Sequence, residues 1–295
     1  MASSLMRLIQ DPPPDYIFEL SEGGIAYVRP GTTQPAFEPL EPGIISPSPI
    51  SDNVLRADAL ADKVRFLAGV APGRKRGRAV LILPDYCARV AVLEFDSFPT
   101  DPKEQLSLVR FRMKRSVPFD VESAVVGFYP QGRKGKGTDV VVVAAALEIV
   151  ARYEAPFRAA GLHPGFVTTS GIAMLDLERG SEISVTARLS GRVLTVLVSQ
   201  AGTLKLVRSV ELGDTSHEEV VAVLFPTMAF IEDQFHAKPA RVLFCGLGDV
   251  DVWEAELGVP VEVLKSRFGT PTQFNAGLHG YLQSVSPDRA GASAA

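Results

Sequence analysis

Three strand-forming stretches in direct succession, followed by a long helix and one more strand, constrain the fold of this chain more than any other feature. Gly191 and Gly202 mark the turns between the three stretches. Strands joined by glycine turns are typical of antiparallel hairpins, and a short apolar run is typical of a buried strand. The predicted elements are strands over Ser184–Ser190, Arg192–Ser199 and Leu204–Leu212, a helix over Ser216–Phe235 and a strand over Arg241–Cys245.

The same order of elements recurs near the N-terminus. Prolines fill residues 30–49, and because proline excludes a helix or a central strand, this region is expected to be a long loop or a pair of edge strands. Asp52 can cap the helix that follows, and Gly69 can end it. The predicted elements are strands over Tyr16–Leu20 and Ile25–Arg29, a helix over Asp52–Ala68 and a buried strand over Arg78–Leu83.

A smaller unit separates these two halves. Its predicted order is strand, helix, strand, strand, helix, strand, which is the order of a split βαβ unit. Asp101 can cap its first helix, and Pro102 suits the first helical position. The elements are predicted over Arg89–Phe95, Asp101–Arg115, Ala124–Pro130, Thr138–Ala146, Leu147–Ala160 and Phe166–Thr169.

The remaining elements complete the second half. They are helices over Gly171–Arg179, Asp249–Leu257 and Gln273–Gln283 and a strand over Val261–Leu264. Pro226 lies inside the long helix, where a proline removes a backbone hydrogen bond, so we expect that helix to kink or split near Val223. The sequence therefore predicts a first lobe over 15–88, an inserted subdomain over 89–169, a second lobe over 170–284 and a disordered tail over 285–295.

Composition and spacing exclude several classes of protein. The net charge of −4 does not favour nucleic acid, and Cys87 and Cys245 are too far apart in sequence for a CxxC zinc motif or a disulfide framework. The longest apolar run, Val140–Leu147, is too short to span a bilayer, which takes about 20 residues. Residues 1–10 lack the apolar core of a signal peptide. We therefore expect a cytoplasmic protein without a metal, which reaches a membrane only through partners.

Several short strings stand in a telling order and spacing: Pro118-Phe119, Ala144–Ala146, Ala160–Pro164, Ile172–Met174, Leu206–Gly213, Phe244–Gly248 and Asn275–Leu278. Together they resemble the PilM family of type IV pilus assembly proteins and, more distantly, the cell-division protein FtsA. The resemblance covers roughly residues 15–284. It implies an α/β, actin-like (ribonuclease H-like) fold with two lobes, duplicated strand-strand-strand-helix halves and an inserted small α+β subdomain.

The resemblance also implies where a nucleotide would bind. Actin-like ATPases hold phosphate on glycine turns, beside aspartates that place Mg²⁺. Here Glu19 replaces the first aspartate, Glu22 places a carboxylate where it would repel phosphate, and Arg188 precedes the second turn, which has no aspartate. The residues that correspond to the nucleotide site are Glu19, Gly23, Gly24, Gly191, Gly246 and Gly248. We therefore expect no ATP hydrolysis. Two alternatives stay open, nucleotide binding without hydrolysis and glycines that only form tight turns.

The function that the resemblance implies is that of a non-catalytic adaptor. In the PilM family, a groove in the actin-like body takes up the cytoplasmic N-terminal peptide of the inner-membrane protein PilN, and the resemblance implies that this groove lies in the first lobe. Two other functions fit the sequence. One is an active ATP-binding actin-like ATPase or kinase relative. The other is the cytoplasmic domain of GspL, a type II secretion protein that continues into a transmembrane helix.

Overall fold

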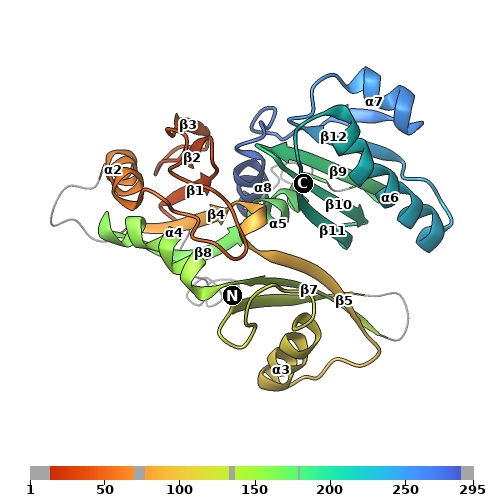
Figure 1. Ribbon diagram of the computed structural model, residues 1–295, viewed down its shortest axis with the longest axis horizontal. Coiled ribbons are helices and arrows are strands. Elements are labelled where there is room, and N and C mark those ends of the chain that lie inside the picture. The colour runs from red at the N-terminus through yellow and green to blue at the C-terminus, as the bar shows by residue number, and fades with distance from the viewer. Residues whose placement is uncertain (1–13, 70–76, 133–136, 179, 287–295) are drawn as a thin grey trace, which may run out of the picture.

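The computed structural model describes residues 14–69, 77–132, 137–178 and 180–286. Figure 1 shows two lobes side by side, each built on one β-sheet, with a smaller sheet beneath them. Each large sheet has five strands, and the small sheet has three. This arrangement confirms the predicted two-lobed α/β fold with duplicated halves and an inserted subdomain.

The first lobe has the strand order β3-β2-β1-β4-β8. The strands are β1 (Tyr16–Leu20), β2 (Gly24–Val28), β3 (Ala36–Pro39), β4 (Gly77–Leu83) and β8 (Leu162–Thr169). The proline-rich region contributes only β3, at the edge of the sheet. Proline has no backbone N–H to donate, so a strand that contains it is tolerated at an edge but not between two neighbours. Helices α2 (Ala57–Ala68) and α4 (Leu147–Ala159) pack against this lobe and bury Leu60, Tyr153 and Phe157 with Phe18 of the sheet.

The second lobe repeats this plan with the order β11-β10-β9-β12-β13. Its strands are β9 (Ile183–Ser190), β10 (Val193–Gln200), β11 (Thr203–Glu211), β12 (Arg241–Cys245) and β13 (Val261–Val263). Its helices are α6 (His217–Phe235) and α7 (Val250–Leu257), which begin at the side-chain caps Ser216 and Asp249. The hairpins and the parallel β9–β12 pair correspond to those of β1, β2 and β4 in the first lobe.

The inserted subdomain is smaller than the sequence predicted. Its sheet has the order β5-β7-β6, formed by β5 (Arg89–Phe95), β6 (Val125–Gln131) and β7 (Thr138–Ala145), with α3 (Pro102–Met113) against it. The predicted split βαβ unit is wrong, because β8 pairs in parallel with β4 of the first lobe. Helix α4 also belongs to the first lobe, since its apolar side chains are buried in that core. The cap at Asp101 is confirmed, because its side chain accepts hydrogen bonds from the backbone of Lys103 and Glu104.

Two helices connect the lobes. These are the short α5 (Ser170–Met174), continued by a 3₁₀ turn η2 (Leu175–Leu177), and α8 (Ala276–Val285). They approach so closely that a Cβ on Gly277 would lie 2.8 Å from Ser170 Cα, and one on Gly280 would overlap the Ala173 carbonyl oxygen. Leu278 and Leu282 of α8 pack with strands β1, β2 and β4. The C-terminal helix therefore returns to the first lobe, instead of ending in the second as predicted.

Three local predictions also differ from the structure. Helix α2 begins at Ala57 without a side-chain cap, and Asp52 instead forms an ion pair with Arg152 at 3.2 Å. Helix α6 continues through Pro226 without the predicted split, because its buried side holds it against the second lobe. Helix α8 includes Val285, and residues 287–295 of the expected tail lie outside the described residues.

Polar contacts fix the subdomain to the second lobe. The buried side chain of Gln131 donates to the Leu204 carbonyl oxygen at 2.9 Å and accepts from the Leu204 N–H at 2.8 Å. Nearby, Lys205 forms an ion pair with Asp139 at 3.5 Å. Because Gln131 satisfies both backbone groups of one residue, it specifies a single position of the subdomain on β11.

Candidate functional site

The two glycine turns singled out by the sequence face each other across the cleft between the lobes. The first turn lies between β1 and β2, where Ser21 and Gly24 close it with backbone hydrogen bonds. The second lies between β9 and β10, where Gly191 has a φ of +56° that favours glycine. A Cβ on Gly191 would overlap Glu22 Oε1. The carboxylate of Glu22 therefore lies directly on the second turn.

The segment before α8 packs against the first turn and against Gly246, which follows β12. The ring of Phe274 lies over Gly23, where a Cβ would be 2.6 Å from its Cζ, and it stacks on Phe37 of β3 with ring centroids 5.5 Å apart. A Cβ on Gly246 would lie 2.8 Å from that of Gln273. The structure thus places Gly23, Gly191 and Gly246 against the protein's own side chains. Of the other two predicted glycines, Gly24 packs on Phe37 of β3, and Gly248 faces open space.

The space that remains between the two turns is small. The cavity lined by Ser21, Glu22, Asp85 and Arg188 has a volume of about 10 Å³, which is room for about one water molecule. Ligand pockets for larger organic molecules typically have volumes of about 300–1,000 Å³. The described residues therefore do not fit a nucleotide in this conformation.

A buried ionic network lies beneath this cavity. Arg188 donates from Nη1 to Glu19 Oε1 at 3.2 Å and from Nη2 to Asp85 Oδ2 at 2.9 Å, and all three side chains are almost fully buried. Asp85 lies in a 3₁₀ turn η1 (Asp85–Cys87) that follows β4. Burial raises the pKa of Glu19, and the neighbouring guanidinium of Arg188 opposes this rise. Burial alone would lower the pKa of Arg188, but Asp85 and Glu19 outweigh it and raise the pKa.

These residues also do not fit a magnesium site. The carboxylates of Glu19 and Asp85 could together hold a cation, but the guanidinium of Arg188 already lies between them. Their other oxygens accept hydrogen bonds from backbone N–H groups. Among the described residues, no group of three or more histidine, cysteine, aspartate or glutamate side chains is placed to hold a metal ion. The sequence indicates Glu19 and Arg188 separately but not Asp85, and the available signal was that Asp85 lies two residues after the end of a buried apolar strand.

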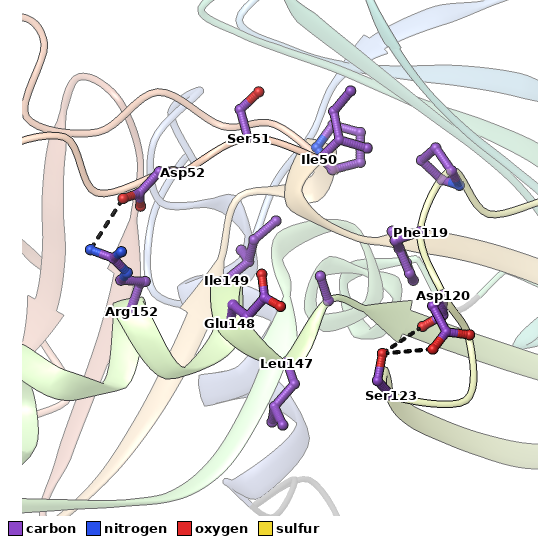
Figure 2. Close-up of a pocket in the computed structure, with 13 residues that line it drawn as sticks. Ile50, Ser51, Asp52, Phe119, Asp120, Ser123, Leu147, Glu148, Ile149 and Arg152 are labelled. Atoms are coloured by element: carbon purple, nitrogen blue, oxygen red, sulfur yellow. Dashed lines mark hydrogen bonds and ion pairs between the residues drawn. The ribbon is translucent and has the colours of Figure 1, made fainter.

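A second hollow lies on the outside of the molecule, between the first lobe and the subdomain. We call it the crevice. It has a volume of about 360 Å³ and is lined by residues 49–52, by the loop at 118–123 and by the start of α4 at 146–152. Figure 2 shows the Asp52–Arg152 pair at one end and Asp120 with Ser123 at the other. Ile50 is 67% exposed although it is apolar.

The crevice combines apolar surface with negative charge. Three carboxylates, those of Asp52, Asp120 and Glu148, line it together with one guanidinium, that of Arg152. Helix α4 begins here at Leu147 without a side-chain cap, and the N–H groups of Ile149 and Val150 donate to the Ala146 carbonyl oxygen. Such a surface can take up an extended segment that brings apolar side chains and a positive charge.

Comparison with known proteins agrees with this architecture. No protein-family model matches the chain, and no curated protein does. A chain of the PilM–PilN type IV pilus biogenesis complex has a TM-score of 0.75 and 20% sequence identity, over 94% of this chain and 100% of that one. A Bacteroides thetaiotaomicron protein with an actin-like ATPase fold has a TM-score of 0.56 and 12% identity, over 92% and 97% of the two chains.

The type II secretion system provides another neighbour. The cytoplasmic domain of EpsL, an inner-membrane component of that system in Vibrio cholerae, has a TM-score of 0.50 and 14% identity, over 90% of this chain and 94% of that one. In the part of this chain that the structure describes, no helix is long and apolar enough to cross a membrane. From its duplicated halves, its inserted subdomain and these likenesses, the chain has the actin-like ATPase fold in a PilM-like form.

Proposed function

We propose that this chain is a non-catalytic adaptor of a type IV pilus assembly platform, and that it binds the cytoplasmic N-terminal peptide of a PilN-type inner-membrane protein. The observation that carries the proposal is the occupied cleft. Glu22, Phe274 and Arg188 fill the space in which an actin-like ATPase would hold phosphate and metal. The likeness to a chain of the PilM–PilN complex supports the choice of partner. On this proposal the protein is cytoplasmic and reaches the inner membrane through that partner.

The degenerate nucleotide site is the first part to test. ATP could enter only if the carboxylate of Glu22 left Gly191 and the ring of Phe274 left Gly23. We expect isothermal titration calorimetry with Mg²⁺ and ATP to give no binding heat, and thermal melts to give no shift. Saturable binding would favour the rival function, an ATP-binding actin-like ATPase or kinase relative.

The crevice is our candidate for the peptide groove. Its negative charge suits a free N-terminus, because an α-amino group with a pKa of about 7.7–8.0 is largely protonated at pH 7. Its apolar part, around Ile50 and Phe119, suits the side chains of an extended peptide. Its position at the start of α4, which packs in the first lobe, also agrees with the expectation that the groove involves that lobe.

A titration with a synthetic PilN-type peptide tests the groove. We expect Ile50→Asp and Glu148→Lys each to weaken binding at least tenfold, measured by fluorescence anisotropy. Phe66→Asp is the matched control, because Phe66 on α2 is also 67% exposed but lies outside the crevice. An N-acetylated peptide should bind more weakly than the free one. Absence of wild-type binding at high micromolar concentration would sink the proposal.

A second function is favoured by the likeness to the EpsL cytoplasmic domain. The chain would then serve a type II secretion platform as a GspL-like cytoplasmic domain. Parallel titrations with a peptide from a type II secretion membrane protein and with the PilN-type peptide separate the two proposals. Tighter binding of the secretion peptide, lost in Ile50→Asp, would move the assignment to that system.

A further inference from the structure

Arg188 comes from the second lobe, but both of its acidic partners come from the first. It lies on β9, whereas Glu19 lies on β1 and Asp85 on the turn after β4. The side chains are 4%, 1% and 2% exposed, so water screens their interaction little. Arg188 also donates to the Gln273 carbonyl oxygen at 3.1 Å, in the segment before α8. One guanidinium therefore joins three parts of the chain that are far apart in sequence.

The network holds the carboxylates on the opposite side as well. Asp85 accepts from the Gly171 N–H at 2.6 Å, at the start of α5. Glu19 accepts from the Leu278 N–H at 2.6 Å, in the first turn of α8. The two connecting helices thus each present a backbone donor to one carboxylate, and Arg188 bridges the pair. Two hydroxyl donors complete the network, Ser170 to Glu19 and Thr195 to Asp85.

The charge balance makes Arg188 the decisive member. Without it, Glu19 and Asp85 would lie buried beside each other with no positive charge, and like charges at that depth repel strongly. A planar guanidinium also fixes direction, because its two nitrogens point at one carboxylate each. A shorter or more flexible cation could neutralise the charge but could not hold both acceptors in this geometry.

We propose that Arg188 acts as a built-in cation that ties the two lobes in one relative position, so that lobe closure needs neither a metal nor a bound ligand. The tie does not depend on the peptide partner. It predicts that closure is constitutive, and that the contact between the two glycine turns persists only while the network is intact.

Three variants test whether the ionic network of Arg188, and not apolar packing alone, holds the two lobes in one relative position. Arg188→Met keeps most of the side-chain volume and removes the charge. Arg188→Lys keeps the charge and loses the planar fork. The triple variant E19Q/D85N/R188M removes every charge of the network, which avoids a buried, unpaired carboxylate. Amide hydrogen exchange of residues 21–24 and 189–192, read by mass spectrometry on the full chain, reports whether the two turns still touch.

We expect exchange in both turns to be at least tenfold faster in Arg188→Met and in the triple variant, and several-fold faster in Arg188→Lys. The triple variant should recover much of the thermal stability that Arg188→Met loses, although its turns stay open. If Arg188→Met fails to fold, the lysine and triple variants still decide the question. Wild-type exchange rates in the triple variant would overturn the proposal, because they would show that closure is independent of the ionic network.

Discussion

The contact between α5 and α8 should make Gly280 intolerant of even one added methyl group. In Gly280→Ala, the new Cβ would overlap the Ala173 carbonyl oxygen and lie 2.7 Å from Met174 Cα. Ordinary carbon–oxygen contacts are about 3.3 Å or longer, and backbone atoms cannot rotate away. Helix α8 must therefore shift by about 1 Å. Overpacking of this kind costs about 1–3 kcal/mol, and more when backbone must move.

Helix propensity opposes this loss, since alanine is favoured over glycine by about 1 kcal/mol inside a helix. We expect a net loss of about 2 kcal/mol, which corresponds to a fall in Tm of roughly 3 °C for a chain of 295 residues, at about 2.1 cal/mol/K of unfolding entropy per residue. Thermal melts and urea titrations measure it. Ser284→Ala in the same helix is the control, because Ser284 is exposed and its loss should change stability by less than about 0.5 kcal/mol. A Gly280→Ala protein as stable as the wild type would refute the reasoning.

Three further predictions follow from buried polar groups. Burial lowers the pKa of His279 below 6.5, so the folded protein binds fewer protons than the unfolded chain just below pH 6.5. The free energy of unfolding should therefore fall as the pH drops through that range. In urea titrations, His279→Asn should make the free energy of unfolding less dependent on pH there. Burial raises the pKa of Cys87, and that of Cys245 to about 11, so neither thiol should react with Ellman's reagent until urea unfolds the protein. Gln131→Ala leaves two buried backbone groups of Leu204 unpaired, which should cost about 2–4 kcal/mol and increase proteolysis at the subdomain boundary.

The sequence predicted the order and type of most elements, because each signal was local. Glycine turns separate β9, β10 and β11, and Asp101 caps α3. The sheet that a strand joins is not a local property. Strand β8 follows the subdomain in the chain, yet it pairs with β4, and only the packing of α4 on the first lobe reveals this. The split predicted at Pro226 is absent for a related reason, because burial of α6 against the second lobe outweighs the loss of one backbone hydrogen bond.

The candidate site was predicted in part. Glu19 and Arg188 each depart from a nucleotide-binding pattern in the sequence, but their contact depends on how the two lobes pack together. The sequence pattern predicts that Phe274 lies in the final helix, whereas in the structure it lies in the segment before that helix, where its ring packs on Gly23 and Phe37. A sequence pattern can indicate that a site has lost its ligands, but it does not indicate which side chains have taken their place.

The polar contacts around Gln131 have a mechanical consequence. The subdomain is joined to the first lobe by two chain crossings and to the second lobe by Gln131, and the second lobe is joined back to the first by Arg188. Each of the three bodies, the two lobes and the subdomain, therefore contacts both of the others. A movement at one of these contacts changes the geometry of the other two. A segment that bound in the crevice and moved the subdomain away from the first lobe would strain the hydrogen bonds of Gln131 and Arg188. Binding at the crevice would then change the contact between the two lobes.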